Sequence, residues 1–128
     1  MQIRKYNRAT DESKLMKMIH DEEGWDYANE NLADKYKAAL ETSITYVACH
    51  GDVLCGYSRS LNDFGEYIYI CDLLVMPAYR GQGIGRQLME SISRDYPHEV
   101  VYVMSGVDEY YEKLGYKRAG SIFEIPCT

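Results

Sequence analysis

A run of closely spaced glycines directly behind the longest apolar stretch is the feature that most constrains this fold. Tyr67 to Met76 is almost continuously hydrophobic, which predicts a central β-strand covered on both faces. Pro77 ends that strand, and glycines follow at alternate positions before a helical pattern begins. A buried strand that passes through a glycine-rich turn into a helix indicates an α/β fold.

Hydrophobic periodicity and turn residues predict the remaining elements. Thr10 is expected to cap the first helix, Asp108 to cap the last, and Gly115 to end that last helix in a left-handed conformation. Strands are predicted at 3–6, 44–49, 53–61, 67–76 and 100–104 and as two strands between 116 and 125 that bend near Gly120, and helices at 11–22, 31–41, 84–96 and 108–115. This order describes a mixed central sheet with helices on both faces.

The composition is that of one soluble domain. The chain has 128 residues, 46% of them hydrophobic and 27% charged, so we predict a single domain over 1–128. No apolar run approaches the roughly 18 residues of a membrane span. The N-terminus lacks the apolar core of a signal peptide, and a cytoplasmic protein without a membrane partner is expected. The net charge of −6 argues against nucleic acid, whose phosphates require a basic face.

The four cysteines predict neither a disulfide framework nor a metal site. Cys49, Cys55 and Cys71 lie in apolar, strand-like runs, and Cys127 is near the end of the chain. No pair has the C-x-x-C spacing of a zinc site, and the three histidines are scattered. We therefore expect buried thiols and no metal.

The glycine turn has the composition of an anion cradle. Without side chains, Gly81, Gly83 and Gly85 let backbone N–H groups converge at the positive end of a helix, which suits a pyrophosphate. Arg80 and Arg86 flank the turn. A nucleotide P-loop requires a lysine that is missing here, and a dinucleotide fingerprint requires different glycine spacing in a first βαβ unit. A tight turn without a ligand remains the alternative at this point.

Two longer motifs resemble one family. The run from Asp72 to Gly85 resembles the central motif of the GNAT N-acetyltransferase superfamily, with Arg80, Gly83 and Gly85 at its three defining positions. The run from Tyr110 to Tyr116 resembles the family's second signature, an aromatic residue and a tyrosine followed by a glycine and another aromatic residue. The resemblance covers essentially the whole chain and implies the GNAT acyl-CoA N-acyltransferase fold, with acetyl-CoA as the acyl donor.

The resemblance also implies the coenzyme contacts. In the family, the pantetheine arm pairs with the edge of the strand before the glycine turn, and the pyrophosphate lies on the turn itself. The implied pantetheine contacts are Leu74, Val75 and Met76, and the implied pyrophosphate contacts are Arg80, Gly81, Gln82, Gly83, Ile84, Gly85 and Arg86. Many members place an asparagine about seven residues before the active-site tyrosine; Met104 stands there in this chain.

Acyl transfer to an amine requires a polarised carbonyl, a proton for the departing sulfur and a neutral amine. Strand-edge N–H groups near Leu74 and Val75 can polarise the carbonyl. The family tyrosine that points at the coenzyme sulfur corresponds to Tyr111, a phenol whose ordinary pKa of about 10 lies above that of a thiol; a packing role is its alternative. Asp72 lies within an apolar strand and is either a general base or a buried carboxylate satisfied by Arg59 or a tyrosine hydroxyl.

The acceptor is expected in the gap between the first two helices. Trp25 and Tyr27 lie there, and Arg59 joins them because it matches, with Trp25, a pattern in a group of small bacterial GNAT proteins. A core role for the tryptophan is the alternative. We therefore predict transfer of an acetyl group to a primary amine of a small molecule or peptide, with an acyl-CoA sensor that lacks turnover as the second hypothesis. A homodimer is possible, because related folds often dimerise.

Overall fold

The computed structural model describes residues 1–127. The chain folds around one five-stranded sheet with the strand order β1-β2-β3-β4-β5. The strands are β1 (Gln2–Lys5), β2 (Ile44–His50), β3 (Val53–Asn62), β4 (Tyr67–Val75) and β5 (Val100–Val103). The helices are α1 (Arg8–Asp21), α2 (Ala33–Thr42), the 3-10 turn η1 (Pro77–Tyr79), α3 (Ile84–Asp95) and α4 (Asp108–Lys113). Neighbouring strands run antiparallel, except that β5 is parallel to β4. The predicted mixed sheet with helices on both faces is confirmed.

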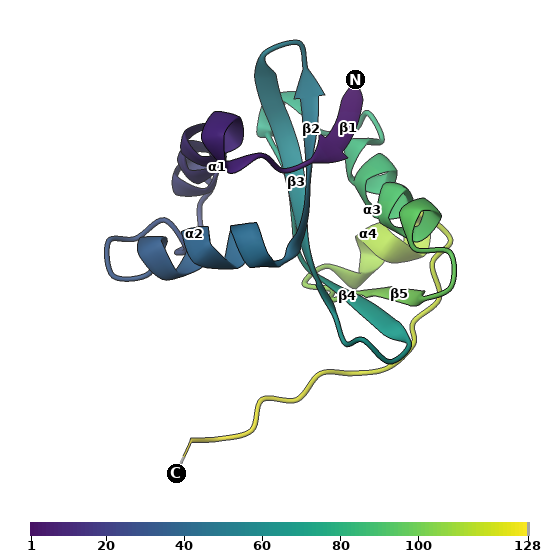
Figure 1. Ribbon diagram of the computed structural model, residues 1–128. Coiled ribbons are helices and arrows are strands. Elements are labelled where there is room, and N and C mark those ends of the chain that lie inside the picture. The colour runs from purple at the N-terminus through teal and green to yellow at the C-terminus, as the bar shows by residue number, and fades with distance from the viewer. Residues whose placement is uncertain (128) are drawn as a thin grey trace.

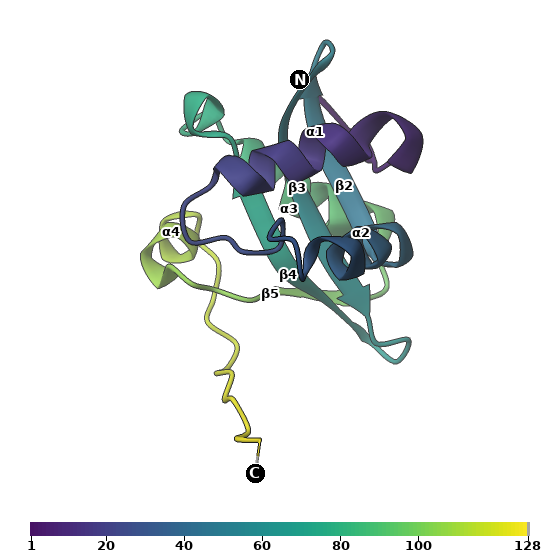
Figure 2. The same ribbon diagram turned by 90° about the vertical axis from the view of Figure 1, so that its left-hand side faces the viewer.

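Each face of the sheet has its own hydrophobic core. Helices α1 and α2 cover one face, and α3 and α4 lie on the other (Figures 1 and 2). Alternation along β2 places Tyr46 in the core under α3 and Val47 in the core under α1 and α2. Helix α3 buries Ile84, Leu88 and Ile92, which lie four residues apart on one side of the helix. The predicted buried face of this helix is thus confirmed.

A β-bulge in β4 changes which face its side chains occupy. Arg59 pairs with Asp72 whereas Ser60 pairs with Ile70, so Cys71 is an extra residue without an opposite partner. Ile70 therefore packs under α3, while Asp72, two residues later, lies on the face of α1 and α2. In a regular strand these two side chains would share one face.

The predicted coverage of β4 on both faces holds only for its second half. Leu74 packs toward α1 and α2, whereas Leu73 and Val75 pack toward α3. In the first half, Tyr67 and Tyr69 remain partly exposed. Ile68 and Ile70 of this half pack under α3, so the first half of β4 is covered on one face only.

Helix α1 begins three residues earlier than predicted, because Asn7 caps it instead of Thr10. The Asn7 Oδ1 atom accepts a hydrogen bond from the Ala9 N–H at 3.0 Å, a typical N-cap contact. Asp11 is buried in the first turn, where it accepts two hydrogen bonds from Arg4 at 2.7 and 2.8 Å. Burial raises the pKa of Asp11, but the hydrogen bonds from Arg4 and the Asn7 N–H hold the pKa below its ordinary value. The pair of Asp11 with Arg4 thus joins the first turn of α1 to β1.

The start of α4 differs from the prediction, whereas its end agrees with it. Val107 precedes the helix, and Asp108 is its first residue instead of its cap; the Asp108 carboxylate accepts a hydrogen bond from Ser105 at 2.6 Å. Gly115 has a φ of 84°, so the predicted left-handed end of the helix is confirmed.

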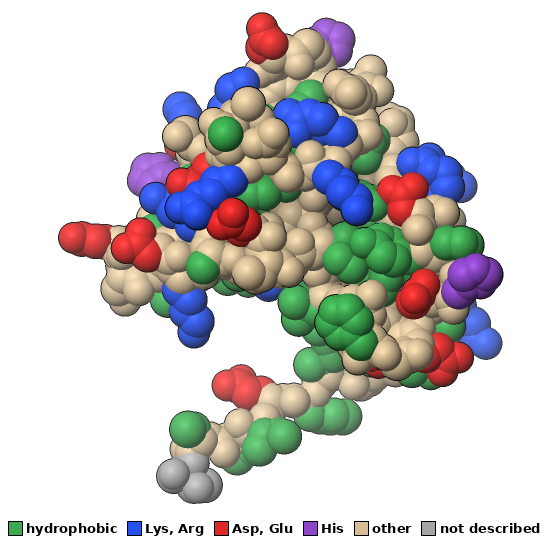
Figure 3. All heavy atoms as spheres, in the orientation of Figure 1, with side chains coloured by type: hydrophobic (Ala, Val, Ile, Leu, Met, Phe, Trp, Pro, Cys, Tyr) green, Lys and Arg blue, Asp and Glu red, His purple; other side chains and the backbone are tan. Residues whose placement is uncertain are grey.

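The two strands predicted between 116 and 125 are absent from the described residues, because the segment has no neighbouring strand with which to pair. Residues 117–127, here called the C-terminal arm, extend away from the body of the molecule (Figures 1 and 3). Their apolar side chains are largely exposed: Ile122 by 71%, Phe123 by 85% and Ile125 by 88%.

All four cysteines are free thiols in the described residues. Cys49 and Cys55 are buried as predicted, Cys71 is half-buried, and Cys127 is exposed on the C-terminal arm. Over residues 1–127, the helices lack either the length or the apolar character that crossing a membrane requires.

Candidate active site

The edge of β4 that faces β5 is open over its second half. Strand β5 pairs with β4 only from Tyr67 to Ile70, and the Met104 N–H closes this pairing on the Ile70 carbonyl at 3.0 Å. Strand β4 continues to Val75, five residues beyond the last pair. Backbone groups along this stretch are therefore free to bind an extended ligand.

Strand alternation decides which backbone groups face the opening. The Met76 N–H donates to the Cys55 carbonyl of β3 at 2.8 Å, so the backbone groups of Leu74 and Met76 point toward β3. Those of Leu73 and Val75 point toward the opening. Of the three predicted strand-edge residues, Val75 presents its backbone groups to the opening, whereas those of Leu74 and Met76 are engaged by β3. Leu73 is the other residue of this stretch whose backbone groups are free.

The glycine turn between β4 and α3 requires glycine at two positions. Gly81 and Gly83 have φ values of 80° and 78°, in the left-handed region. The Cβ position of each meets no heavy atom within 4 Å, so the space beside both residues is open. Gly83 is the N-cap of α3, and neither a capping side chain nor an acidic residue of the first turn satisfies the helix N-terminus among the described residues. The free N–H groups and the helix dipole together form a cradle for an anion.

The two arginines that flank the turn are both ion-paired. Arg80 donates through Nη2 to both carboxylate oxygens of Glu22 at 2.9 Å and through Nε to the Val75 carbonyl at 2.9 Å. Arg86 contacts Glu90 at 2.7 Å on the same helix. Arg80 therefore joins the end of α1 to the end of β4, and the free anion-binding groups are the backbone N–H groups of the turn.

The two tyrosines of the second motif occupy different environments on α4. The Tyr110 hydroxyl lies 2.5 Å from the position that a Cβ of Gly85 would take, so the third glycine leaves room for this ring. Tyr111 packs against the core under α3, and its ring lies 5.0 Å from that of Tyr110 at an angle of 80°. Burial raises the pKa of both hydroxyls, and for Tyr111 the neighbouring Tyr110 adds to the effect. The sequence does not predict the contact between Tyr110 and the turn. Its only signal there is that Tyr110 is a second aromatic residue in the motif.

Asp72 is the centre of a buried hydrogen-bond network. It is 5% exposed and accepts hydrogen bonds from Arg59 Nε at 2.6 Å, Tyr36 at 2.7 Å and Tyr27 at 3.1 Å. The Tyr36 and Tyr57 hydroxyls lie 2.6 Å apart and extend the network. Of the two roles considered for Asp72, these contacts correspond to the carboxylate satisfied by Arg59 and tyrosine hydroxyls.

The electrostatics of this network keep its tyrosines and its arginine each in one protonation state. Burial, with the Asp72 charge as the next cause, raises the pKa of Tyr27 and of Tyr36. Burial and the neighbouring Tyr36 raise the pKa of Tyr57. Burial lowers the pKa of Arg59, but Asp72 outweighs that effect and raises it overall. The tyrosines therefore remain neutral donors and the guanidinium remains charged.

The three residues expected to bind the acceptor lie around this network. Tyr27 stacks on Tyr36 with ring centroids 4.2 Å apart, and Trp25 meets the edge of Tyr27 at 5.9 Å. Arg59 lies 5.4 Å above the Tyr36 ring. Trp25 is partly buried against the core under α1 and α2, so it both packs and borders the gap. Tyr36 and Tyr57 were missed as members of the site, because their spacing only indicated core positions.

Two surface cavities lie at the β1 side of the sheet and contain none of these residues. One is bordered by β1, α2 and the end of α3, and the other by β1, α1 and the β2–β3 turn. The candidate site is instead an open strand edge beside a turn, and it coincides with neither of these two cavities.

Comparison with known proteins identifies the family. Residues 41–118, more than half of the chain, match the acetyltransferase (GNAT) domain. The chain belongs to the GNAT acetyltransferase family. Its members are acyltransferase enzymes, and the matched region includes β2 to β5, the glycine turn and α4.

Curated relatives are longer than this chain. It is 35% identical over 69 residues to the histone acetyltransferase TAP1 of Glycine max, a match that covers 50% of this chain and 30% of that protein. A GCN5-related N-acetyltransferase 2 of Arabidopsis thaliana is 33% identical over 69 residues, which is 50% of this chain and 27% of that protein. The chain thus spans less than a third of the length of these relatives.

Solved structures share the fold over nearly the full length. A GNAT family acetyltransferase from Streptococcus pneumoniae superposes with a TM-score of 0.72 at 21% identity, covering 97% of each chain. The aminoglycoside N-acetyltransferase AAC(6')-Iy, in complex with CoA, superposes with a TM-score of 0.76 at 14% identity, covering 98% of this chain and 93% of the other. At these identities the likeness concerns the fold alone.

The first prediction concerns the cradle. Replacing Gly83 with alanine adds a methyl group beside the free N–H groups, and we expect the affinity for acetyl-CoA, measured by calorimetry, to fall at least about tenfold. Gly51→Ala is the matched control, because Gly51 also has a positive φ, 60°, and open space around its Cβ position, but belongs to the β2–β3 turn and not to the glycine turn. Both variants carry a similar backbone strain of about 1–2 kcal/mol. Equal affinity in the two variants would place the anion elsewhere.

The second prediction concerns Asp72. Asp72→Asn leaves the Arg59 guanidinium, whose side chain is only 15% exposed, without its charge partner, and breaking a buried pair in this way costs about 3–5 kcal/mol. Urea denaturation should show this loss of unfolding free energy, whereas Glu90→Gln, which breaks the exposed pair with Arg86, should change it little. A fully stable Asp72→Asn protein that has lost only activity would instead identify Asp72 as the general base.

Proposed function

We propose that residues 1–128 form one GNAT domain that transfers an acetyl group from acetyl-CoA to a primary amine of a small molecule or peptide. One observation carries this proposal: the free edge of β4 beyond Ile70 leads directly into a turn whose N–H groups are free. An extended acyl-pantetheine followed by a pyrophosphate has the donors and acceptors that match these two features in the same order.

The coenzyme is expected to lie along the free edge. Backbone groups of Leu73 and Val75 pair with the pantetheine amides, and the N–H groups from Gly81 to Arg86 receive the pyrophosphate. The Val75 carbonyl already accepts a hydrogen bond from Arg80. Val75 therefore offers the coenzyme mainly its N–H group.

The acceptor amine is expected to approach from the gap between α1 and α2. Trp25 and Tyr27 border this gap as aromatic walls. Arg59 donates to Asp72 and to the Ser43 hydroxyl, so we assign it to holding Tyr27 and Tyr36 in place. Its role in acceptor binding is thus indirect.

The proposed reaction is direct attack of the amine nitrogen on the thioester carbonyl. Strand-edge N–H groups polarise the carbonyl oxygen, the new C–N bond forms, and the C–S bond breaks with the electron pair going to sulfur. Tyr111 supplies a proton to the thiolate, and the proton lost by the amine passes to water in the gap. Asp72 positions the tyrosines that surround this gap, as its three hydrogen bonds indicate.

A second candidate is an acyl-CoA sensor without turnover. The engagement of Asp72 favours it, because the buried carboxylate near the gap is occupied by an arginine and two tyrosines. Both candidates require the same coenzyme site and differ only in whether thiol is released.

The third prediction separates these two candidates. Incubation with acetyl-CoA and a panel of primary amines should release free coenzyme A thiol continuously, with at least one amine well above the rate without acceptor. Trp25→Ala should raise the KM for that amine while the acetyl-CoA affinity stays unchanged, because Trp25 contacts Tyr27 and the core under α1 and α2 and is not one of the residues assigned to the coenzyme. Tight acetyl-CoA binding without thiol release across amine classes would support the sensor instead.

The fourth prediction concerns the proton donor. Tyr111→Phe keeps the ring and removes the hydroxyl, so folding should persist while kcat falls by about 10²–10⁴, the range of a positioned general acid. Tyr110→Phe is the matched control on the same helix and should change kcat less than about threefold. If Tyr110→Phe carries the loss and Tyr111→Phe does not, the two roles are exchanged and Tyr111 is a packing residue.

A further inference from the structure

Glu22 is the carboxylate that links the end of α1 to the free edge of β4. It is the C-cap of α1, and both of its carboxylate oxygens accept hydrogen bonds from Arg80 Nη2 at 2.9 Å. The Nε atom of the same guanidinium donates to the Val75 carbonyl at 2.9 Å. Figure 2 shows α1 crossing the sheet so that its end lies over β4. One guanidinium therefore holds the Glu22 carboxylate beside the last residue of the open strand edge.

The backbone of Glu22 also holds a residue of the acceptor side. The Trp25 N–H donates to the Glu22 carbonyl at 3.3 Å, and the tryptophan ring meets the edge of Tyr27. Glu22 thus lies between the aromatic side chains near the gap between α1 and α2 and the strand edge proposed for the acyl donor. An amine that approaches the donor from this gap is expected to pass the Glu22 carboxylate.

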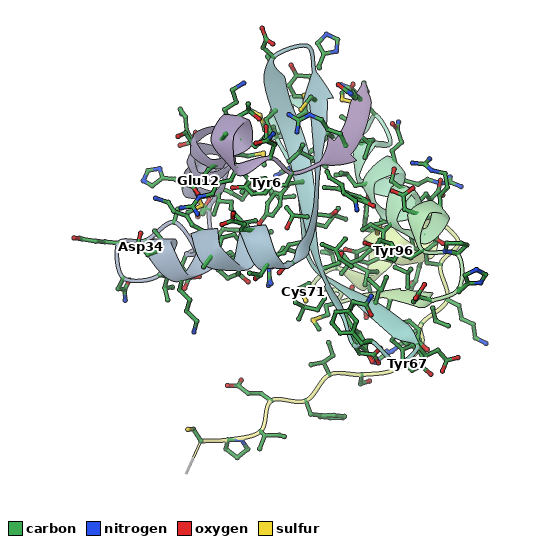
Figure 4. All side chains as sticks on the ribbon, in the orientation of Figure 1. Tyr6, Glu12, Asp34, Tyr67, Cys71 and Tyr96 are labelled. Atoms are coloured by element: carbon green, nitrogen blue, oxygen red, sulfur yellow. The ribbon has the colours of Figure 1, made fainter. Side chains whose placement is uncertain are left out.

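The other acidic side chains of this region are less suited to receive a proton from the amine. Asp72 already accepts three hydrogen bonds. Glu23 and Asp26 are exposed, and Asp34 lies at the outer end of α2, away from the sheet (Figure 4). The Glu22 side chain is 20% exposed, so it is accessible to water and still tied to the strand edge.

The partner of Glu22 belongs to the anion side of the site. Arg80 directly precedes the glycine turn, whose N–H groups are free, and its side chain is 49% exposed. A pyrophosphate on the turn carries more negative charge than one carboxylate, so it competes with Glu22 for the guanidinium. An ion pair this exposed is weak enough to be exchanged. Binding of the coenzyme is therefore expected to free the Glu22 carboxylate.

We propose that Glu22 accepts the proton lost by the amine, and that Arg80 occupies this carboxylate until the coenzyme binds. This role depends on the proposed function. The nitrogen lone pair forms the C–N bond, the N–H bond breaks with its electron pair left on nitrogen, and the proton passes through water in the gap to Glu22. Sulfur receives a separate proton from Tyr111. Glu22 then releases a proton to water and Tyr111 regains one, so both side chains return to their starting states.

The fifth prediction tests both parts of this role with one substitution. Glu22→Gln removes the charge that competes for Arg80, so the calorimetric Kd for acetyl-CoA should fall about threefold, within the worth of a partly exposed ion pair. The kcat of the same variant should also fall, by about 10²-fold, the low end of what a positioned base contributes. A residue that only stabilised the fold would weaken binding and turnover together.

Glu23→Gln is the matched control. It removes the same charge from the next residue, which is exposed, and solvent screening should keep its effect on Kd and on kcat below about twofold. Circular dichroism should show that both variants are folded.

A second background assigns the two effects to their partners. In Arg80→Met the guanidinium is missing, so adding Glu22→Gln should leave the Kd for acetyl-CoA unchanged and still lower kcat. A Glu22→Gln variant that binds acetyl-CoA more weakly, or that keeps its kcat while the wild type turns over, would overturn this inference alone. A wild type that binds acetyl-CoA but releases no thiol with any amine would overturn the proposed function and this inference with it.

Discussion

The β-bulge at Cys71 is the constraint on which the candidate site depends. One extra residue in β4 moves Asp72 from the α3 face, where Ile68 and Ile70 pack, to the face of α1 and α2. There it meets Arg59 from β3 and Tyr36 from α2. The change of face also fixes which backbone groups of β4 point toward β5, and β4 and β5 separate just where the bulge occurs.

A buried carboxylate on this face holds together the aromatic side chains near the gap between α1 and α2. Asp72 costs free energy to bury, and its contacts with Arg59, Tyr36 and Tyr27 offset that cost only when all of them are present. Since these partners come from β3, α2 and the loop between α1 and α2, the network joins three segments that are distant in sequence. The aromatic side chains near the gap between α1 and α2 are therefore arranged around a buried charge.

A second ion pair links this gap to the glycine turn. Arg80 holds Glu22, at the end of α1, and the Val75 carbonyl, at the end of β4. Its charge thus holds the end of α1 against the end of β4, next to the glycine turn. The turn itself presents free backbone N–H groups, and glycines at positive φ are the reason that these groups are accessible.

Much of this molecule is determined by local sequence. The apolar run of β4, the glycines at alternate positions and the four-residue period of α3 each specify an element through its own residues, and the family motifs rest on the same positions. Element boundaries failed where a single polar contact decided them: Asn7, two residues after the end of β1, caps α1 through its side chain, and Thr10, three residues later, is already inside the helix.

Tertiary structure decided what depends on pairing between distant segments. Sequence alone left Asp72 open between two roles, because its partners are 13, 36 and 45 residues away. It also assigned Leu74 and Met76 to the free strand edge, since the register with β3 that turns their backbone groups inward is not a local property. The segment from 116 to 125 has the residues of strands but no partner in its own domain, and a strand exists only where another strand supplies its hydrogen bonds.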